Sequence, residues 1–365
     1  MAENQSFPFD GHFLPSNQVF PLKRQTVRFS HHLPLHFSQK LPIFATGILS
    51  GSHKQLRDMK RRKFYKNTLT HCYQRTEDDG VLFYTYSDHL VYFTHYCIMA
   101  RKHHIKVFAM CQMPDHVHDS VMTDRKENLE RFKCETNTSF SRKHNERFHR
   151  KGPVLEGPYG RAPKFEEKKA KTNLIYVENN PVERKLVTHA EDYRWNYLAY
   201  AESDHPFSEK LVIRDARWPL QKAVKEVKAQ CKAGKPMSYA QLERLFQPLD
   251  RKERLQLTDF IVTTYNVIDY QATINCFGSY EKLLTAVHST TGSEYDLNEN
   301  FAGKSDVCYN QMTTLLLREG KLKDIHDLLT LSIDERAELF HFLQRSVDAL
   351  PEQIAKFLHV TLKKG

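Results

Sequence analysis

A regular alternation of hydrophobic and polar positions begins near Lys63 and predicts a series of strands and helices. Runs of β-branched and aromatic residues indicate strands, whereas longer runs with spaced apolar residues indicate helices. The strands are expected at 64–75, 105–113 and 116–123, and the helices at 90–104, 126–149 and 165–178. Residues 151–163 show neither pattern and are expected to form a loop, and Pro181 is expected to end the last helix.

The order strand, helix, strand, strand, helix, helix is typical of an α+β sandwich. We therefore expect a ferredoxin-like antiparallel sheet with helices on one face over residues 63–203. Residues 1–62 are rich in Pro, Ser, His and Gln, and they lead into a basic cluster at 60–63. That composition predicts a basic, poorly ordered extension, and an arm that binds phosphates is the alternative.

The pattern changes after a proline-containing stretch, which predicts a linker at 204–219 and an all-helical accessory domain at 220–365. Two capping boxes, which mark helix N-termini, support the helical prediction: Ser238 with Gln241, and Ser332 with Glu335. Two short helices joined by a turn near the end predict a helix-turn-helix motif at about 333–360. An ordinary pair of packed helices fits the same pattern equally well.

Composition narrows the range of partners and compartments. The formal net charge of +10 favours a polyanionic partner such as nucleic acid. Seven scattered cysteines without a CxxC pair argue against a disulfide framework or a cysteine zinc site, and for a reducing compartment. No segment approaches the roughly 20 apolar residues of a membrane span, and the N-terminus lacks the pattern of a secretory signal. We expect a soluble cytoplasmic protein without membrane contact.

His116 and His118 are the first candidates for chemistry. Alternate residues of a strand share a face, so both imidazoles would point the same way while Val117 enters the core. Two imidazoles so placed can hold a divalent metal and leave positions open for a substrate. Because the chain has 20 histidines, about one such pair is expected by chance, and the motif alone is weak.

Tyr176 and Asn180 are the second candidates. They are four residues apart and would share one helix face if the helix continues that far. An activated tyrosine can act as a nucleophile, and an amide oxygen can bind a metal. The alternative is structural, because a tyrosine among apolar residues often belongs to the core and Asn180-Pro181 is an ordinary helix stop.

Taken together, the segments MPDHVHDSV at 113–121 and YVENNPVERKLVTHAEDYRW at 176–195 resemble a known family. They are similar to the single-tyrosine HUH transposases, especially the REP-associated tyrosine transposase branch. In that branch the strand typically reads MPNHVHLLV and the later helix YIxxNPV. The resemblance covers about residues 63–200, and its specificity lies in the order and spacing of the two segments.

The resemblance implies a metal-dependent DNA strand transferase. His116 and His118 would bind Mg²⁺ or Mn²⁺, and Asn180 stands where some relatives place a third ligand. Tyr176 matches the nucleophile, which attacks a phosphodiester of single-stranded DNA beside a hairpin and leaves a 5′-phosphotyrosine and a free 3′-OH. Single-stranded or hairpin DNA would be the partner, and both a monomer and a homodimer remain open. The alternative is a DNA-binding or regulatory protein that keeps the fold without catalysis.

Three residues depart from the family pattern. Asp115 replaces the usual asparagine, and Asp119 with Ser120 replaces the usual pair of apolar residues. Asp119 would face away from the histidine pair, and a buried carboxylate without a partner is costly. This predicts either a locally exposed strand or a weakened domain.

A DNA-binding surface is expected around the second helix and the loop after it. The basic residues there are Arg142, Lys143, Arg147, Arg150, Lys151, Arg161 and Lys164. They could neutralise phosphates and make binding sensitive to salt, and a solvated helix face is the alternative.

Overall fold

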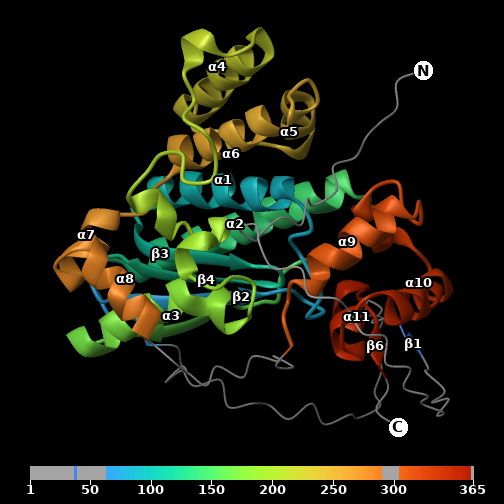
Figure 1. The fold of residues 1–365 in the computed structure, drawn as a ribbon. Coiled ribbons are helices and arrows are strands. Elements are labelled where there is room, and N and C mark those ends of the chain that lie inside the picture. The colour runs from blue at the N-terminus through green and yellow to red at the C-terminus, as the bar shows by residue number, and fades with distance from the viewer. Residues whose placement is uncertain (1–36, 39–62, 290–303, 363–365) are drawn as a thin grey trace, which may run out of the picture.

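The structure is a computed structural model, and it describes residues 37–38, 63–289 and 304–362 (Figure 1). At its centre is a four-stranded antiparallel sheet with the order β3-β4-β2-β5. Its strands are β2 (Thr70–Arg75), β3 (Lys106–Met113), β4 (His116–Met122) and β5 (Gly160–Pro163). The expectation for residues 1–62 lies outside the described residues, except for β1 (Phe37–Ser38), which pairs with β6 (Thr361–Leu362).

Helices cover both faces of the sheet (Figure 1). On one face lie α1 (Tyr86–Lys102) and α2 (Lys126–Arg147), and on the other lies α3 (Glu167–Glu183). The expected α+β class, with an antiparallel sheet and a helical C-terminal region, is confirmed. The expected helix layer corresponds to α1 and α2. A second layer, α3, covers the other face of the sheet, so both faces of β4 are buried.

Alternate residues of β4 therefore meet different helices. Its two sets of side chains are His116, His118 and Ser120 toward α3, and Val117, Asp119 and Val121 toward α1 and α2. Ser120 Oγ donates a hydrogen bond to Asn173 Oδ1 of α3 at 2.8 Å. On the other side, the Asp119 carboxylate forms an ion pair with Lys133 of α2.

Two expectations about local structure are wrong. The loop expected at 151–163 ends in β5, whose sequence GRAP carries no strand pattern and which forms by pairing with β2. Pro181 lies inside α3 instead of ending it. This close to the C-terminus of a helix, a proline removes a single backbone hydrogen bond, and the Arg184 N–H still donates to the Asn180 carbonyl at 3.1 Å.

Further helices extend the sandwich on both sides. Next to α1 lie α5 (Tyr239–Phe246) and α6 (Arg251–Tyr265), and α4 (Trp218–Lys232) packs on α6. Beside α3 and the edge of β3 lie α7 (Tyr270–Phe277) and α8 (Tyr280–Ser289). A buried ion pair between Arg194 and Asp259 connects α6 to the segment that follows α3.

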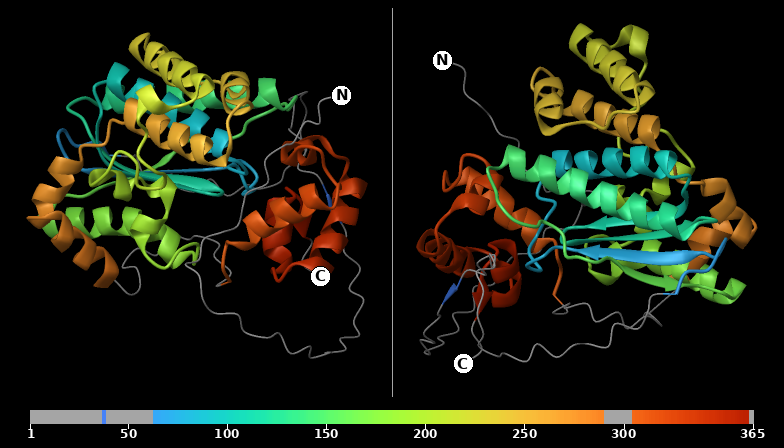
Figure 2. Two further views of the ribbon diagram at one scale, coloured as in Figure 1. Left: turned by 45° about the horizontal axis from the view of Figure 1, so that its top comes forward. Right: turned by 180° about the vertical axis from the view of Figure 1, so that it is seen from behind.

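The C-terminal lobe, defined here as residues 304–362, lies at the end of the sheet away from α7 and α8 (Figure 2). Its helices are α9 (Cys308–Arg318), α10 (Ile333–Ser346) and α11 (Pro351–Phe357). Both expected capping boxes are confirmed, at the starts of α5 and α10. Within the described residues, no helix has the length and apolar content needed to cross a membrane.

Candidate active site

The histidine pair lies on the inner side of α3, as the strand alternation predicts. His116 and His118 are 5% and 2% exposed, and their ring centroids are 4.7 Å apart with nearly perpendicular planes. Both rings point to the same face because they are two positions apart along β4. A third imidazole joins them from the neighbouring strand β2, since His71 Nε2 lies 3.0 Å from His118 Nδ1.

His71 is a site residue that sequence reasoning missed. It shares a face of β2 with Tyr73, which lies directly opposite His118 in the β2–β4 register. Strand periodicity within β2 was visible in the sequence. The pairing that brings His71 to His118 was not, because strand register depends on residues far apart in the chain.

Tyr176 of α3 lies against these imidazoles. Its ring centroid is 5.4 Å from that of His118 and 5.6 Å from that of His71, with both contacts edge-on. The phenol predicted as nucleophile and the histidine pair predicted as metal ligands are therefore brought together. This proximity arises because α3 packs against β3 and β4.

Asn180 lies one turn further along α3. Because α3 places Asn173 at Ser120 and Tyr176 at His118, it runs antiparallel to β4. Four helical residues rise about 6 Å, which is close to the length of two strand residues, so this spacing predicts that Asn180 lies at the level of His116. Its side chain is 1% exposed, and among the described residues no hydrogen-bond partner reaches its amide oxygen or nitrogen. A buried amide without a partner is costly unless a ligand completes it.

The tautomers set by neighbouring groups suit metal binding. His116 Nδ1 lies 2.5 Å from Asp115 Oδ1, so the carboxylate accepts the Nδ1 proton and the lone pair of the ring lies on Nε2. When His118 Nδ1 donates to His71, its lone pair likewise lies on Nε2. Two imidazoles and one amide oxygen fit a divalent cation such as Mn²⁺. Within the described part of the chain, no cluster of three or more His, Cys, Asp or Glu side chains is arranged around a metal position.

Asp115 connects His116 to the C-terminal lobe. Its second carboxylate oxygen forms an ion pair with Lys356 of α11. Burial alone would raise the pKa of Asp115, but the Lys356 ammonium and His116 hold it well below its usual range. The partner of Asp115 is therefore a cation from a distant segment, which sequence reasoning did not identify.

Asp119 is buried, but it is not alone. Its carboxylate pairs with Lys133, and both side chains are at most 3% exposed. The Lys133 ammonium also lies 5.3 Å from the ring centroid of Phe132 and 5.6 Å from that of Tyr96. The expectation of an exposed strand at this position is wrong, because α2 supplies the missing counter-charge.

The basic residues expected to bind DNA do not gather around Tyr176. Arg142, Lys143 and Arg147 belong to α2, on the opposite face of the sheet. Several of the set face carboxylates: Lys143 with Glu146 at 2.7 Å, Arg147 with Glu243 at 3.2 Å, Arg150 with Asp78 at 3.8 Å, and Arg161 with Glu130 at 3.9 Å. Arg142 and Lys151 are exposed, and Lys164 is half-buried just after β5. Their role in binding DNA stays a prediction.

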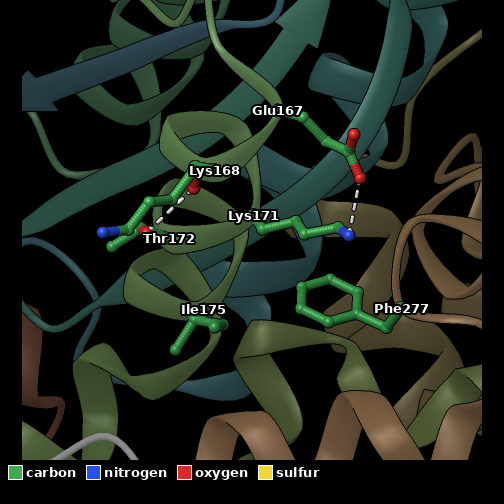
Figure 3. A pocket seen from close by; sticks show the side chains of 6 residues that line it. All are labelled: Glu167, Lys168, Lys171, Thr172, Ile175 and Phe277. Carbon is green, nitrogen blue, oxygen red and sulfur yellow. Dashed lines mark hydrogen bonds and ion pairs between the residues drawn. The ribbon is translucent and has the colours of Figure 1, made fainter.

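The site is closed in this arrangement. Tyr176 is 4% exposed, because α3 presses it against the sheet. A shallow depression of about 410 Å³ lies on the outer side of α3 (Figure 3). Its lining residues are Glu167, Lys168, Lys171, Thr172, Ile175 and Phe277, with Lys171 paired to Glu167 at 2.6 Å. Neither Tyr176 nor any of the three histidines lines the depression, so it gives no access to them.

Comparison with known proteins adds little to this picture. No protein-family model matches the chain, and no curated protein matches it. Among solved structures, the chain is similar to a REP-associated tyrosine transposase bound to a REP hairpin, with 13% identity and a TM-score of 0.34. That similarity covers 39% of this chain and 82% of the other. A likeness this distant carries no weight, so the function of the chain has to be inferred from the residues of the site.

Proposed function

We propose that this protein cleaves single-stranded DNA and transfers the cut strand through a covalent link to Tyr176. The observation that carries the proposal is the edge-on contact of the Tyr176 ring with His118 and His71. A tyrosine beside an imidazole that can bind a cation is placed to attack a phosphate held by the same cation. Hairpin or single-stranded DNA is the proposed partner.

In this mechanism His116, His118 and Asn180 would hold Mg²⁺ or Mn²⁺. The cation supplies a Lewis acid that neutralises charge developing on the scissile phosphate. Tyr176 Oη attacks phosphorus, a phosphotyrosine bond forms at the 5′ side, and the bond to the 3′ oxygen breaks. The phenol proton is transferred overall to that oxygen, which leaves as a 3′-OH. The bond energy is retained in the covalent link, so resealing needs no further energy source.

A labelled DNA hairpin with a single-stranded flank, incubated with the protein and Mn²⁺, tests the proposal on a denaturing gel. We expect a protein–DNA adduct with the wild type and none with Tyr176→Phe, because the substitution removes only the attacking oxygen. DNA binding, measured in parallel by fluorescence anisotropy, should change less than about twofold.

Tyr73→Phe is the matched control, since Tyr73 lies directly opposite His118 on the same face of the sheet. We expect this variant to form the adduct as the wild type does. An adduct that survives Tyr176→Phe and disappears with Tyr73→Phe would show that the wrong phenol has been assigned.

The closed site favours a second candidate function. Tyr176 is only 4% exposed, so a DNA strand does not reach it in this arrangement. A buried Tyr176 is equally compatible with a protein that binds DNA without cleaving it. Wild-type protein that binds the hairpin but forms no adduct in Mn²⁺ would favour this regulatory role.

A further inference from the structure

The C-terminal lobe reaches the predicted metal centre through one side chain. Lys356 Nζ of α11 forms an ion pair with Asp115 Oδ2 in the turn between β3 and β4. The other oxygen of the same carboxylate, Asp115 Oδ1, accepts the Nδ1 proton of His116 at 2.5 Å. Lys356, Asp115 and His116 thus form a continuous chain of charged and hydrogen-bonded groups.

The carboxylate in the middle of this chain needs both partners. The Asp115 side chain is 8% exposed, and a buried carboxylate is costly unless it is paired and hydrogen-bonded. One partner alone would leave the carboxylate rotation undetermined, whereas two partners on different oxygens fix its plane. The orientation of the His116 ring is then fixed as well, because its Nδ1 proton is directed at the fixed oxygen.

The backbone holds Lys356 in place relative to this turn. The Val81 N–H donates to the Lys356 carbonyl at 3.2 Å, and Tyr84 Oη donates to the Phe357 carbonyl at 2.8 Å. The same segment also binds the β3–β4 turn, since the N–H groups of Leu82 and Phe83 donate to the Pro114 carbonyl at 2.8 Å and 3.0 Å. Residues 81–84 therefore fix α11 and the β3–β4 turn in one arrangement.

We propose that Lys356 is a positioning residue of the metal centre, so that the C-terminal lobe completes the site. Lys356 balances the charge of Asp115, and Asp115 in turn directs His116 toward the cation. The inference rests on the proposed function, because it concerns the same metal centre. It gives residues 304–362 a role within the site, in addition to any contact with DNA.

Binding of Mn²⁺ to the full-length protein, followed by the electron paramagnetic resonance signal of the free ion, tests this without relying on activity. We expect Lys356→Met to weaken Mn²⁺ binding about tenfold, as loss of an outer partner of a ligand does. Lys356→Arg should restore most of the affinity, because it keeps the charge. Lys321→Met is the matched control, an exposed lysine of the same lobe, and should bind as the wild type does.

A second substitution separates positioning from folding. Asp115→Asn keeps an oxygen that accepts the His116 proton, yet it needs no cation. In that background Lys356→Met should change the Mn²⁺ affinity less than about twofold, whereas a general loss of packing would cost the same in both backgrounds. Equal losses of Mn²⁺ affinity in the two backgrounds, or no loss in the single variant Lys356→Met, would overturn this inference and leave the proposed function standing. A wild type that binds no Mn²⁺ would overturn the proposed metal centre and this inference with it.

Discussion

Charged residues inside the sandwich are accommodated by specific counter-charges. Asp119 pairs with Lys133, and Arg194 pairs with Asp259, with all four side chains at most 4% exposed. Glu178 of α3 is accommodated differently, because burial raises the pKa of its carboxyl well above its usual range. Burial therefore disfavours the charged form of that side chain.

The pair of Asp119 and Lys133 makes a direct prediction about stability. Lys133→Met should lower the free energy of unfolding by about 3–5 kcal/mol, because it leaves a buried carboxylate without its partner. Adding Asp119→Asn should recover much of that loss, since the charge is then removed as well. Urea unfolding followed by circular dichroism measures both.

Lys143→Met serves as the control on the same helix, because Lys143 pairs with Glu146 at the surface and its loss should matter little. If Lys133→Met unfolds at the same urea concentration as Lys143→Met, the buried pair does not contribute to the free energy of unfolding.

Local patterns in the sequence were sufficient for the residues within one element. The strand period placed His116 and His118 on one face of a strand, and the helix period placed Tyr176 and Asn180 on one face of a helix. The contacts made by His71 and Lys356 could not be predicted in this way. The partner of Lys356 is Asp115, far away in the sequence, and a lone lysine near the end of a chain carries no signal of such a contact.

At the scale of elements, α3 both presents Tyr176 and covers it. Its hold on the sheet includes the hydrogen bond from Ser120 to Asn173 at 2.8 Å, one turn before Tyr176. Because Tyr176 is 4% exposed, the proposed function requires α3 to shift away from β4 before a DNA strand reaches the phenol. The strength of that hold should therefore affect the rate of cleavage.

We expect Ser120→Ala to speed adduct formation by about 2- to 12-fold, which corresponds to the roughly 0.5–1.5 kcal/mol of one hydrogen bond. Single-turnover kinetics with the labelled hairpin would measure the rate. Thr172→Ala should leave it unchanged, because the Thr172 hydroxyl donates to Lys168 within α3 at 2.9 Å. A rate that does not respond to Ser120→Ala would mean that the helix shift is not limiting.

The elements themselves could mostly be predicted, and β5 shows why one could not. Its residues pair with β2 in a register that places Gly160 opposite Tyr73. A Cβ atom at Gly160 would lie 1.9 Å from the Tyr73 ring, so a glycine is required there. In a sequence, glycine and proline indicate a loop, whereas here they allow a close approach between strands.

At the scale of the whole molecule, the C-terminal lobe contacts aspartates of the sandwich through two histidines and one lysine. His326 Nε2 lies 3.0 Å from the Asp88 carboxylate, and His359 Nδ1 lies 2.6 Å from Asp78. Together with Lys356 and Asp115, these pairs belong to the polar contacts of the interface. The predicted helix-turn-helix segment is part of this lobe, and α11 exposes only Glu352 fully among its residues. That leaves α11 little surface with which to read a DNA groove.

Docking through His326 should depend on pH. Burial would lower the pKa of His326, but Asp88, together with Asp324, raises it to about 9. A folded-state pKa above the unfolded value of about 6.5 adds stability that is complete below pH 6.5 and is lost as the pH rises through 9. The free energy of unfolding of the wild type should thus decline between these values.

His326→Gln should flatten this decline, because its amide does not titrate. Urea unfolding at intervals from pH 6 to pH 9.5 would compare the two proteins. The acid side provides a separate check, since Asp88 has its pKa lowered to about 2 despite burial, and its contribution is lost only in strong acid. Parallel curves for wild type and variant above pH 6.5 would contradict the assignment.

The two faces of β4 also determine how the chain can fail to fold. A shift of β4 by one residue along its neighbours would exchange its faces. A shift in one direction would place Asp119 under Tyr176 and Ser120 at the Lys133 ammonium, whereas a shift in the other would place Val117 under Tyr176 and His118 at Lys133. Such a misaligned strand would lose its ion pair and its predicted ligand set in the same step. The chemistry of the site thereby selects the alignment of the strand that carries it.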